Sequence, residues 1–294
     1  MNKRDSIDYI VIRESNLLLN KAFNRAFAKI SRLNLNDIKD AQLINDIIKT
    51  EFDQTVIGIS DTLYGGVKEQ FQASIRKAQS ELRSQDSNFR YTFDTTDKAM
   101  LDILDEGNSL FMNRLYSSSV EGKVIDSIKT MVTEGKSKKE ITDEIASMLS
   151  VSGKKAINSI TRNVVNTNTL TRSIATANLL EKAGSVKYGY IVVSDNKTSD
   201  ICKAIKGKTG EVSDLVKTRD DIINIPRTDY DTYVNRLEQV SPMIMGTEKD
   251  GFYTQQDANK PFKRIWTKDQ VMQIPGVQVP PLHNNCRTEL KIIL

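Results

Sequence analysis

Apolar residues near the start of the chain recur at steps of four and three, the spacing of a helix that buries one face. They are Leu19, Phe23, Ala26, Ile30 and Leu33. This stripe predicts a helix from Ile7 to about Leu33. A second helical pattern runs from Ile38 to Phe52 and is followed by the Gly65-Gly66 pair. We expect this pair to separate two helices, because glycine is a poor residue for a helix interior.

Two further helices are expected before residue 117. One covers Val67 to Arg83, and the other covers Asp97 to Tyr116. Between them, the polar segment 84–88 and the aromatic run Phe89 to Phe93 favour an extended connection. Residues 1–134 are therefore expected to form a predominantly helical N-terminal region.

The pattern changes after residue 134. Ser137 and Glu140 have the spacing of a capping box, in which each side chain bonds a free backbone N–H at a helix start. A helical segment rich in threonine and asparagine then runs from Lys154 to Ala183, and Gly184 suits its C-cap. The segment Val186 to Ser194 is rich in β-branched and aromatic residues, which predicts a strand.

Segment 211–263 has the features of an insertion. It contains three prolines and many polar residues, and a local helical pattern covers Tyr230 to Val240. Such segments more often lie at the surface or contact a partner than form a core. The expected fold class is α+β: a predominantly helical N-terminal region, 1–134, and a small α+β C-terminal domain, 135–294, that carries this insertion.

The composition is that of a soluble globular protein. The chain has 294 residues, of which 38% are hydrophobic and 27% charged, enough for one large or two ordinary domains. No apolar run approaches the roughly 20 residues that span a bilayer, so we expect no membrane-spanning segment. No signal-peptide pattern is present either, and two cysteines are too few for a secreted disulfide scaffold. We expect the protein to work in the compartment where it is made.

The net charge of +4 is unevenly spread along the chain. From Lys154 to Lys208 there are ten lysines and arginines against three acidic residues. This surplus favours a surface that binds double-stranded DNA through its phosphates, without sequence specificity, with Lys203, Lys206 and Lys208 as candidate contacts. An ordinary solvated face with loop lysines explains the same charges equally well.

The only histidine and both cysteines fall in two short segments. Cys202 lies in the segment 200–208, and His283 and Cys286 lie in the segment 279–288. Thiolate and imidazole are the usual ligands of zinc, and a His-x-x-Cys spacing places two of them on one turn of backbone. These three residues are the candidate metal ligands.

A complete set of four zinc ligands is not evident. A close-spaced partner of Cys202 would stand at Ser199, so the fourth ligand would have to be water, Asp195 or Asp200. Two other interpretations compete with zinc. One is buried packing without metal, and the other is a Cys202–Cys286 disulfide, which would contribute about 4 kcal/mol to stability. A structural zinc ion would contribute more, on the order of 10 kcal/mol or above.

Enzyme activity is not expected from these residues. An open fourth position suits a catalytic zinc ion, but catalysis also needs a general base nearby. His283 is the only histidine, and it lies between Pro280-Pro281 and Cys286. This position favours a structural role for His283 over a role as a general base. The Gly207-Lys208-Thr209 segment lacks the upstream glycine of a phosphate-binding loop, and we expect it to form a turn.

The C-terminal half carries an ordered series of motifs. The capped helix is followed by the long helix with Arg162 and Arg172, and then by Lys187-Tyr-Gly-Tyr-Ile. Next come Asp195-x-x-Thr-Ser-Asp-Ile-Cys-Lys and, from Pro280, Pro-Pro-Leu-His-Asn-Asn-Cys-Arg-Thr. This series resembles the C-terminal domain of the phage minor head proteins, the Mu protein F-like or SPP1 gp7-like head morphogenesis family. The resemblance covers about residues 135–294, and its last motif is the most specific.

The resemblance implies a virion protein of a tailed phage, assembled in the host cytoplasm and located in the capsid interior or at the portal vertex. The implied partners are the portal protein, the scaffold or major capsid protein, and packaged or ejected DNA. Residues 1–134, which the resemblance does not cover, would be the assembly region that contacts portal or scaffold. Cys202, His283 and Cys286 would hold the C-terminal domain together as structural residues.

The chain departs from the family's commonest pattern at three positions. Ser199 and Thr288 stand where cysteines are common, and Tyr190 stands where a tryptophan is frequent. The main alternative function is a zinc-dependent hydrolase or nuclease that acts on DNA or on the cell wall during phage entry. A free-standing DNA-binding protein is a third interpretation.

Overall fold

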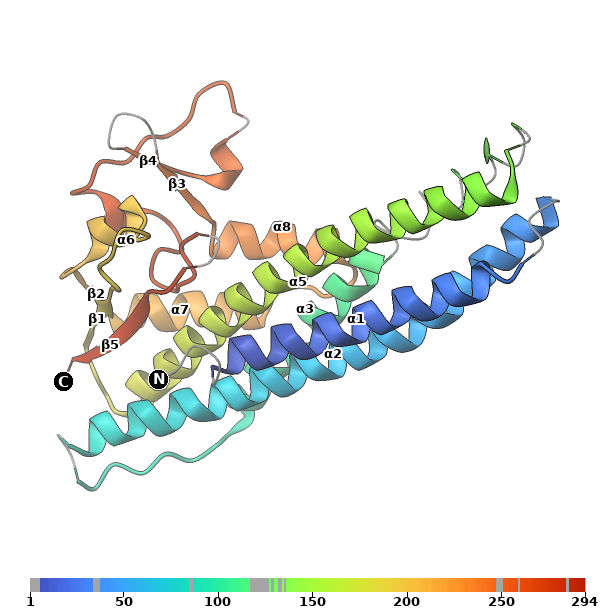
Figure 1. The fold of residues 1–294 in the computed structure, drawn as a ribbon. Helices are drawn as coiled ribbons and strands as arrows, with labels where there is room; N and C mark the ends of the chain where they lie inside the picture. Colours follow the sequence, from blue (N-terminus) through green and yellow to red (C-terminus); the bar gives the residue numbers. More distant parts are fainter. Residues whose placement is uncertain are drawn as a thin grey trace. The chain divides into compact units, whose positions relative to one another are not determined.

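Long helices dominate the first part of the chain, and short helices and strands follow (Figure 1). The computed structural model describes residues 6–33, 38–84, 87–116, 127, 130–131, 134, 136–246, 251–258, 260–283 and 286–293. The helices are α1 (Ile7–Ile30), α2 (Ile38–Arg83), α3 (Thr95–Tyr116), α5 (Lys138–Lys182), α6 (Asp200–Ile205), α7 (Val212–Ile223) and α8 (Tyr230–Val240), with the 3-10 helices η3 (Gln255–Asp257) and η4 (Val271–Gln273). The strands are β1 (Lys187–Ile191), β2 (Thr209–Glu211), β3 (Ile244–Gly246), β4 (Phe252–Thr254) and β5 (Glu289–Ile293). The predicted fold class, a predominantly helical N-terminal region with a small α+β C-terminal part, is confirmed.

Two predicted helix boundaries are wrong. The Gly65-Gly66 pair lies inside α2, and the two helical segments predicted on either side of Gly153 form the single helix α5. The buried residues of α2 continue at steps of four across the glycine pair, as Ile59, Leu63, Val67 and Phe71. A glycine in a helix interior costs about 1 kcal/mol relative to alanine. The free energy gained by burying this apolar stripe is larger, so the helix continues through the pair.

The predicted signals at the two ends of α5 are confirmed. The backbone N–H of Ser137 donates to the Glu140 carboxylate at 2.8 Å, and the Glu140 N–H donates to the Ser137 hydroxyl at 3.4 Å. Gly184 has a φ of +66°, a left-handed conformation that ends the helix and favours glycine. The helix therefore begins and ends at residues with the expected capping chemistry.

The chain divides into two compact units. The first consists of residues 1–65 and 108–164, and the second of residues 66–107 and 165–294. The domain boundary expected between residues 134 and 135 adjoins residues outside the described part, and it stays a prediction.

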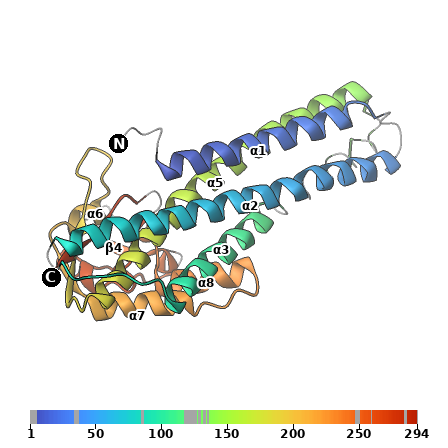
Figure 2. The same cartoon turned by 90° about the horizontal axis from the view of Figure 1, so that it is seen from below.

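Aromatic packing forms part of the core of the first unit. In this unit α1 runs beside the first part of α2 (Figures 1 and 2). The ring of Phe23 packs edge-on against that of Phe52 with centroids 4.8 Å apart, and Phe52 stacks on Tyr116 at 5.8 Å. Gly153 lies against the Phe23 ring so closely that an added Cβ would stand 3.0 Å from it. The absence of a side chain at Gly153 therefore permits this packing.

A buried carboxylate links α1 to α2 in the same unit. The Glu51 side chain is 8% exposed and lies 2.5 Å from Lys29 Nζ and 2.6 Å from Arg25 Nε. The hydrogen bonds from Lys29 and then from Arg25 lower the pKa of Glu51. Glu51 is therefore held in its charged form between two cations.

The core of the second unit includes an antiparallel sheet with strand order β2-β1-β5. Tyr188 and Tyr190 on β1 point to the same buried face, and their hydroxyl oxygens lie 3.2 Å apart. The Tyr190 hydroxyl donates to the carbonyl of Val277 at 3.1 Å. Gly210 on β2 lies opposite Tyr188, where an added Cβ would stand 2.5 Å from the Tyr188 hydroxyl oxygen. The predicted strand is confirmed over Lys187–Ile191.

Segment 211–263 contains more regular structure than predicted. Helix α8 confirms the helical pattern from Tyr230 to Val240, whereas α7 was not predicted. Helix α7 carries Arg219, which is 3% exposed and donates to the Asn178 side-chain oxygen at 3.0 Å and to Asp220 at 2.7 Å. This helix therefore contributes buried side chains, although the segment was expected to lie at the surface.

A buried acid joins the start of α3 to the end of α5 in the second unit. Asp97 is fully buried and accepts hydrogen bonds from the Asn178 amide and from Lys182 Nζ, the latter at 2.9 Å. It also accepts from the backbone N–H of Asp94 at 2.9 Å. The buried charge is thus paired and bonded, as a charge in a protein interior must be.

Among the described residues, no helix combines the length and the apolar character needed to cross a bilayer.

Candidate metal centre

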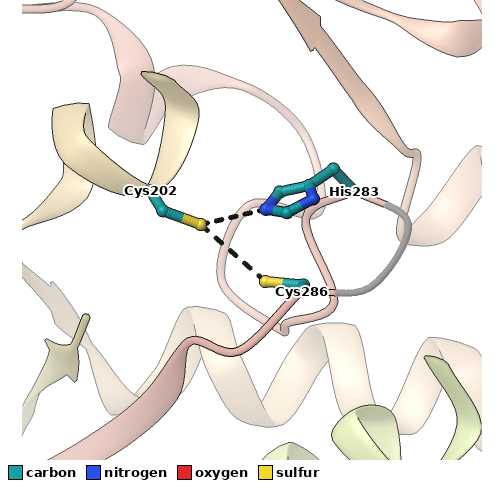
Figure 3. Close-up of side chains that lie close together, drawn as sticks. All are labelled: Cys202, His283 and Cys286. Atoms are coloured by element: carbon teal, nitrogen blue, oxygen red, sulfur yellow. Dashed lines mark hydrogen bonds between the residues drawn. The ribbon is translucent and has the colours of Figure 1, made fainter. Parts of the chain in front are cut away.

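Three residues from two segments that are distant in sequence converge in the second unit (Figure 3). Cys202 comes from α6, and His283 and Cys286 come from the segment that precedes β5. Their ligand atoms all lie within 4.8 Å of one another, with both cysteines buried and the histidine half-buried. This group can hold a metal ion.

Hydrogen bonds to the backbone position the segments that carry the three side chains. Ser199 caps α6, and its hydroxyl accepts a hydrogen bond from the backbone N–H of Cys202 at 3.4 Å. The backbone N–H of Cys286 donates to the carbonyl of His283 at 3.2 Å, which closes a turn. The Thr169 hydroxyl on α5 donates to the carbonyl of Cys286 at 3.1 Å. The threonine-rich helix therefore anchors the His-x-x-Cys segment directly.

The distances fit a shared metal ion. The two Sγ atoms lie 3.9 Å apart, and both cysteines are free. Two thiolates bound to a tetrahedral zinc ion through bonds of about 2.3 Å stand about 3.8 Å apart, whereas a disulfide requires about 2.05 Å. Nε2 of His283 lies 3.1 Å from Sγ of Cys202, within reach of the same ion.

Two hydroxyl groups complete the surroundings of these residues. Ser199 Oγ lies 2.8 Å from His283 Nε2, and the Thr288 hydroxyl donates to Cys202 Sγ at 3.0 Å. Thr288 is buried, so this bond is shielded from solvent. Both hydroxyls therefore bond candidate ligand atoms.

Both carboxylates considered as a fourth ligand have other partners. The Asp195 carboxylate accepts two bonds from the Arg287 guanidinium, at 2.7 and 2.8 Å, and Asp200 pairs with Lys203 at 3.0 Å. The Arg287 guanidinium lowers the pKa of Asp195 well below its usual range. Because Arg287 directly follows Cys286, this ion pair ties the loop after β1 to the His-x-x-Cys segment. The pair is partly exposed, so its role is to position the loop more than to stabilise the fold.

The two thiols differ in their tendency to ionise. The hydrogen bond from Cys202, followed by the His283 ring, lowers the pKa of Cys286. The same bond and burial raise the pKa of Cys202. The pair therefore accommodates one negative charge readily, and a cation between the sulfurs would stabilise the second thiolate.

A small cavity adjoins the three residues. Its volume is about 20 Å³, and Ser199, Cys202, His283 and Thr288 are among its lining residues. A water molecule needs about 10–15 Å³ of such space, and a ligand pocket typically offers about 300–1,000 Å³. The cavity therefore has room for an ion or a water molecule beside the three residues.

The three lysines proposed to contact DNA have different surroundings. Lys203 and Lys206 are exposed, and Lys208 is half-buried. Lys203 pairs with Asp200, and Lys206 Nζ donates to the Ser194 hydroxyl at 3.0 Å. The turn expected at Gly207-Lys208-Thr209 lies at Lys206-Gly207, with a φ of +77° at Gly207, and Thr209 already begins β2. The role of these lysines in DNA binding stays a prediction.

Thr169 and Arg287 belong to the site but were not predicted from the sequence. Thr169 lies more than a hundred residues before Cys286, and the threonine-rich character of its helix was the only signal. The position of Arg287 beside Cys286 was visible, but its pairing with Asp195 depends on tertiary structure.

Comparisons of the chain with models of protein families, with curated proteins and with solved structures find no match.

Proposed function

We propose that this protein is a minor head protein of a tailed phage, with a C-terminal module held together by a zinc ion. The observation that carries the proposal is the convergence of Cys202, His283 and Cys286. His283 and Cys286 come from the motif in which the resemblance to minor head proteins is most specific, and Cys202 comes from an earlier motif of the same series. The Arg287–Asp195 pair, from the same two segments, adds a second link.

Zinc is the metal that the donor set favours. Two thiols and an imidazole are soft or borderline ligands of the kind found in structural zinc sites. The sulfur–sulfur distance of 3.9 Å agrees with a shared zinc ion, and the adjoining cavity leaves room for water as a fourth ligand. A bound ion would join Cys202 to Cys286, which are 84 residues apart, and so fix α6 against the segment before β5.

A structural role fits the site better than zinc-dependent hydrolysis. The only histidine of the chain belongs to the candidate ligand set, so it is not free to act as a base. A base for water activation would have to come from another residue type. The Asp195 carboxylate is paired with Arg287, and Asp200 is paired with Lys203.

The assembly role can be tested during infection. A tagged full-length protein should sediment with procapsids and with mature virions, and copurify with the portal protein. The Cys202→Ser variant should reach procapsids in smaller amounts, because its C-terminal module is loosened. Asp200→Asn, which changes an exposed residue on the same helix, serves as the matched control and should be incorporated normally. Absence of the wild-type protein from both procapsids and virions would refute the assignment.

A further inference from the structure

Cys202 and Cys286 are the only two cysteines of the chain, and they lie close enough to react with each other (Figure 3). Their Sγ atoms are 3.9 Å apart, and both thiols are free. A disulfide bond needs a separation of about 2.05 Å, so each sulfur has to move by only about 1 Å to form one. The same two side chains can therefore bind a shared zinc ion or bond directly to each other.

The small cavity beside the site gives an oxidant access to one of the two sulfurs. Cys202 and His283 line it together with Lys197 and Arg287, whose side chains are exposed. Cys286 is fully buried and does not line it. The volume of about 20 Å³ admits a molecule of about the size of water, and hydrogen peroxide is only slightly larger. A peroxide that enters the cavity therefore meets the sulfur of Cys202 first.

The hydroxyl groups around Cys202 suit such a reaction. The Thr288 hydroxyl donates to Cys202 Sγ at 3.0 Å, and Ser199 Oγ lies 2.8 Å from His283 Nε2. A hydroxyl can also donate to a hydroxide ion, which is the product that a peroxide releases when it oxidises a thiolate. Neither group is a thiol, so Cys286 is the one residue of the chain that can form a disulfide with an oxidised Cys202.

We infer that Cys202 and Cys286 are a redox pair, in which a peroxide replaces the zinc link between the two cysteines with a disulfide. The inference rests on the zinc site of the proposed function. It deepens that function, because it adds a second chemical state of the same site.

The exchange takes two steps, and it starts from thiolates because cysteines bind zinc in that form. The Cys202 thiolate attacks one oxygen of hydrogen peroxide, so that an S–O bond forms, the O–O bond breaks and hydroxide leaves. The Cys286 thiolate then attacks the Cys202 sulfur, so that the S–S bond forms, the S–O bond breaks and a second hydroxide leaves. The two sulfurs lose two electrons and the peroxide gains them. His283 alone cannot hold zinc, so the ion is released.

The exchange would keep α6 joined to the segment before β5 in both chemical states. The proposed virion protein is assembled in a reducing cytoplasm, where thiols persist, whereas a released particle is in an oxidising medium. Zinc would provide the link in the first environment, and the disulfide would provide it in the second.

The inference is tested on full-length, zinc-containing protein treated with hydrogen peroxide. Zinc release is followed with a chromophoric chelator, and the peptides that carry Cys202 and Cys286 are identified by mass without reduction. We expect one Cys202–Cys286 disulfide and one released zinc ion per chain, and a thiol reductant with added zinc should restore the starting state. In excess chelator, the oxidised protein should unfold at a higher temperature than the reduced protein, because only the oxidised protein keeps the link.

Two serine variants and a control test which sulfur reacts first. In Cys286→Ser, peroxide should convert Cys202 to a sulfenic acid that a cyclic 1,3-dione traps. In Cys202→Ser, little or no such adduct should form on Cys286, because its sulfur is buried. The control Asp200→Asn changes an exposed residue of α6 and should form the disulfide as the wild type does.

Two results with zinc-containing protein would overturn the inference and leave the proposed zinc site intact. One is protein that keeps its zinc and both thiols in peroxide. The other is release of zinc with sulfinic or sulfonic acids on the cysteines and no disulfide between them. Protein that contains no zinc before the oxidant is added would contradict the proposed zinc site itself, so the two failures are distinguishable.

Discussion

Ser199 and Thr288 bond two of the three candidate ligands. Each contributes a neutral hydroxyl that bonds a ligand atom, at 2.8 Å from His283 and 3.0 Å from Cys202. In a structural zinc site the ion is usually bound by four protein side chains, each a cysteine or a histidine, and the candidate site of this chain has three. The hydroxyl at residue 199 stands nearest to the histidine nitrogen and is therefore the position from which a fourth protein ligand can be added.

Ser199→Cys should raise the affinity for zinc by about tenfold or more, because a thiolate replaces a neutral hydroxyl beside His283. The affinity is measured by competition with a chromophoric chelator. Thr288→Ser keeps the hydroxyl that bonds Cys202 and should leave the affinity unchanged. Equal affinities for Ser199→Cys and the wild type would show that residue 199 does not face the ion.

Glu51 makes the first unit sensitive to acid. Because Lys29 and Arg25 lower its pKa below the ordinary value of 4.5, its stabilising contribution is present above that value. The contribution is lost as the pH falls through the lowered pKa. Glu51→Gln should reduce the free energy of unfolding at neutral pH by about 1 kcal/mol or more. Urea titrations across pH should show this difference narrowing below pH 4.5, and a difference independent of pH would contradict the role of the charge.

At the scale of elements, two long helices carry glycines whose surroundings differ. Gly65 in α2 has no atom within 4 Å of the place where a Cβ would stand, whereas at Gly153 in α5 the Phe23 ring is 3.0 Å away. The helix cost of glycine is the same at both positions. Only the space around the backbone distinguishes them, which makes them a matched pair.

Gly65→Ala should stabilise the protein by about 0.5–1 kcal/mol, because alanine is the better helix residue and meets no neighbour. Gly153→Ala should increase the free energy of unfolding by less than Gly65→Ala does, or should decrease it, since the Phe23 ring must move. The two free energies of unfolding are compared by urea denaturation. A larger gain at Gly153 than at Gly65 would contradict the packing described for the first unit.

The sequence predicted element types better than element ends. The stripe of α1 and the caps of α5 were recognised because they depend on residues only a few positions apart. The continuity of α2 through Gly65-Gly66 was missed because it depends on burial against other helices. Helix α7 was missed for the same reason: its burial includes Arg219, a charged residue whose partner Asn178 lies on another helix.

At the scale of the whole molecule, the candidate metal centre belongs to one of the two units. Cys202, His283 and Cys286 all lie in the second unit, together with both partners of β1. Their grouping was predictable because the chain has no other cysteine or histidine. The contacts of Thr169, Thr288 and Arg287 were not predictable, because they join segments whose relative placement the sequence does not encode locally.

The metal content of the protein tests the central claim most directly. Full-length protein prepared without chelator is analysed for zinc, beside the Cys202→Ser variant and the Asp200→Asn control. We predict about one zinc ion per chain in the wild type and in the control, and a large loss of zinc from Cys202→Ser. Wild-type protein without zinc, or a Cys202→Ser variant that retains it, would contradict a zinc ion held by Cys202, His283 and Cys286.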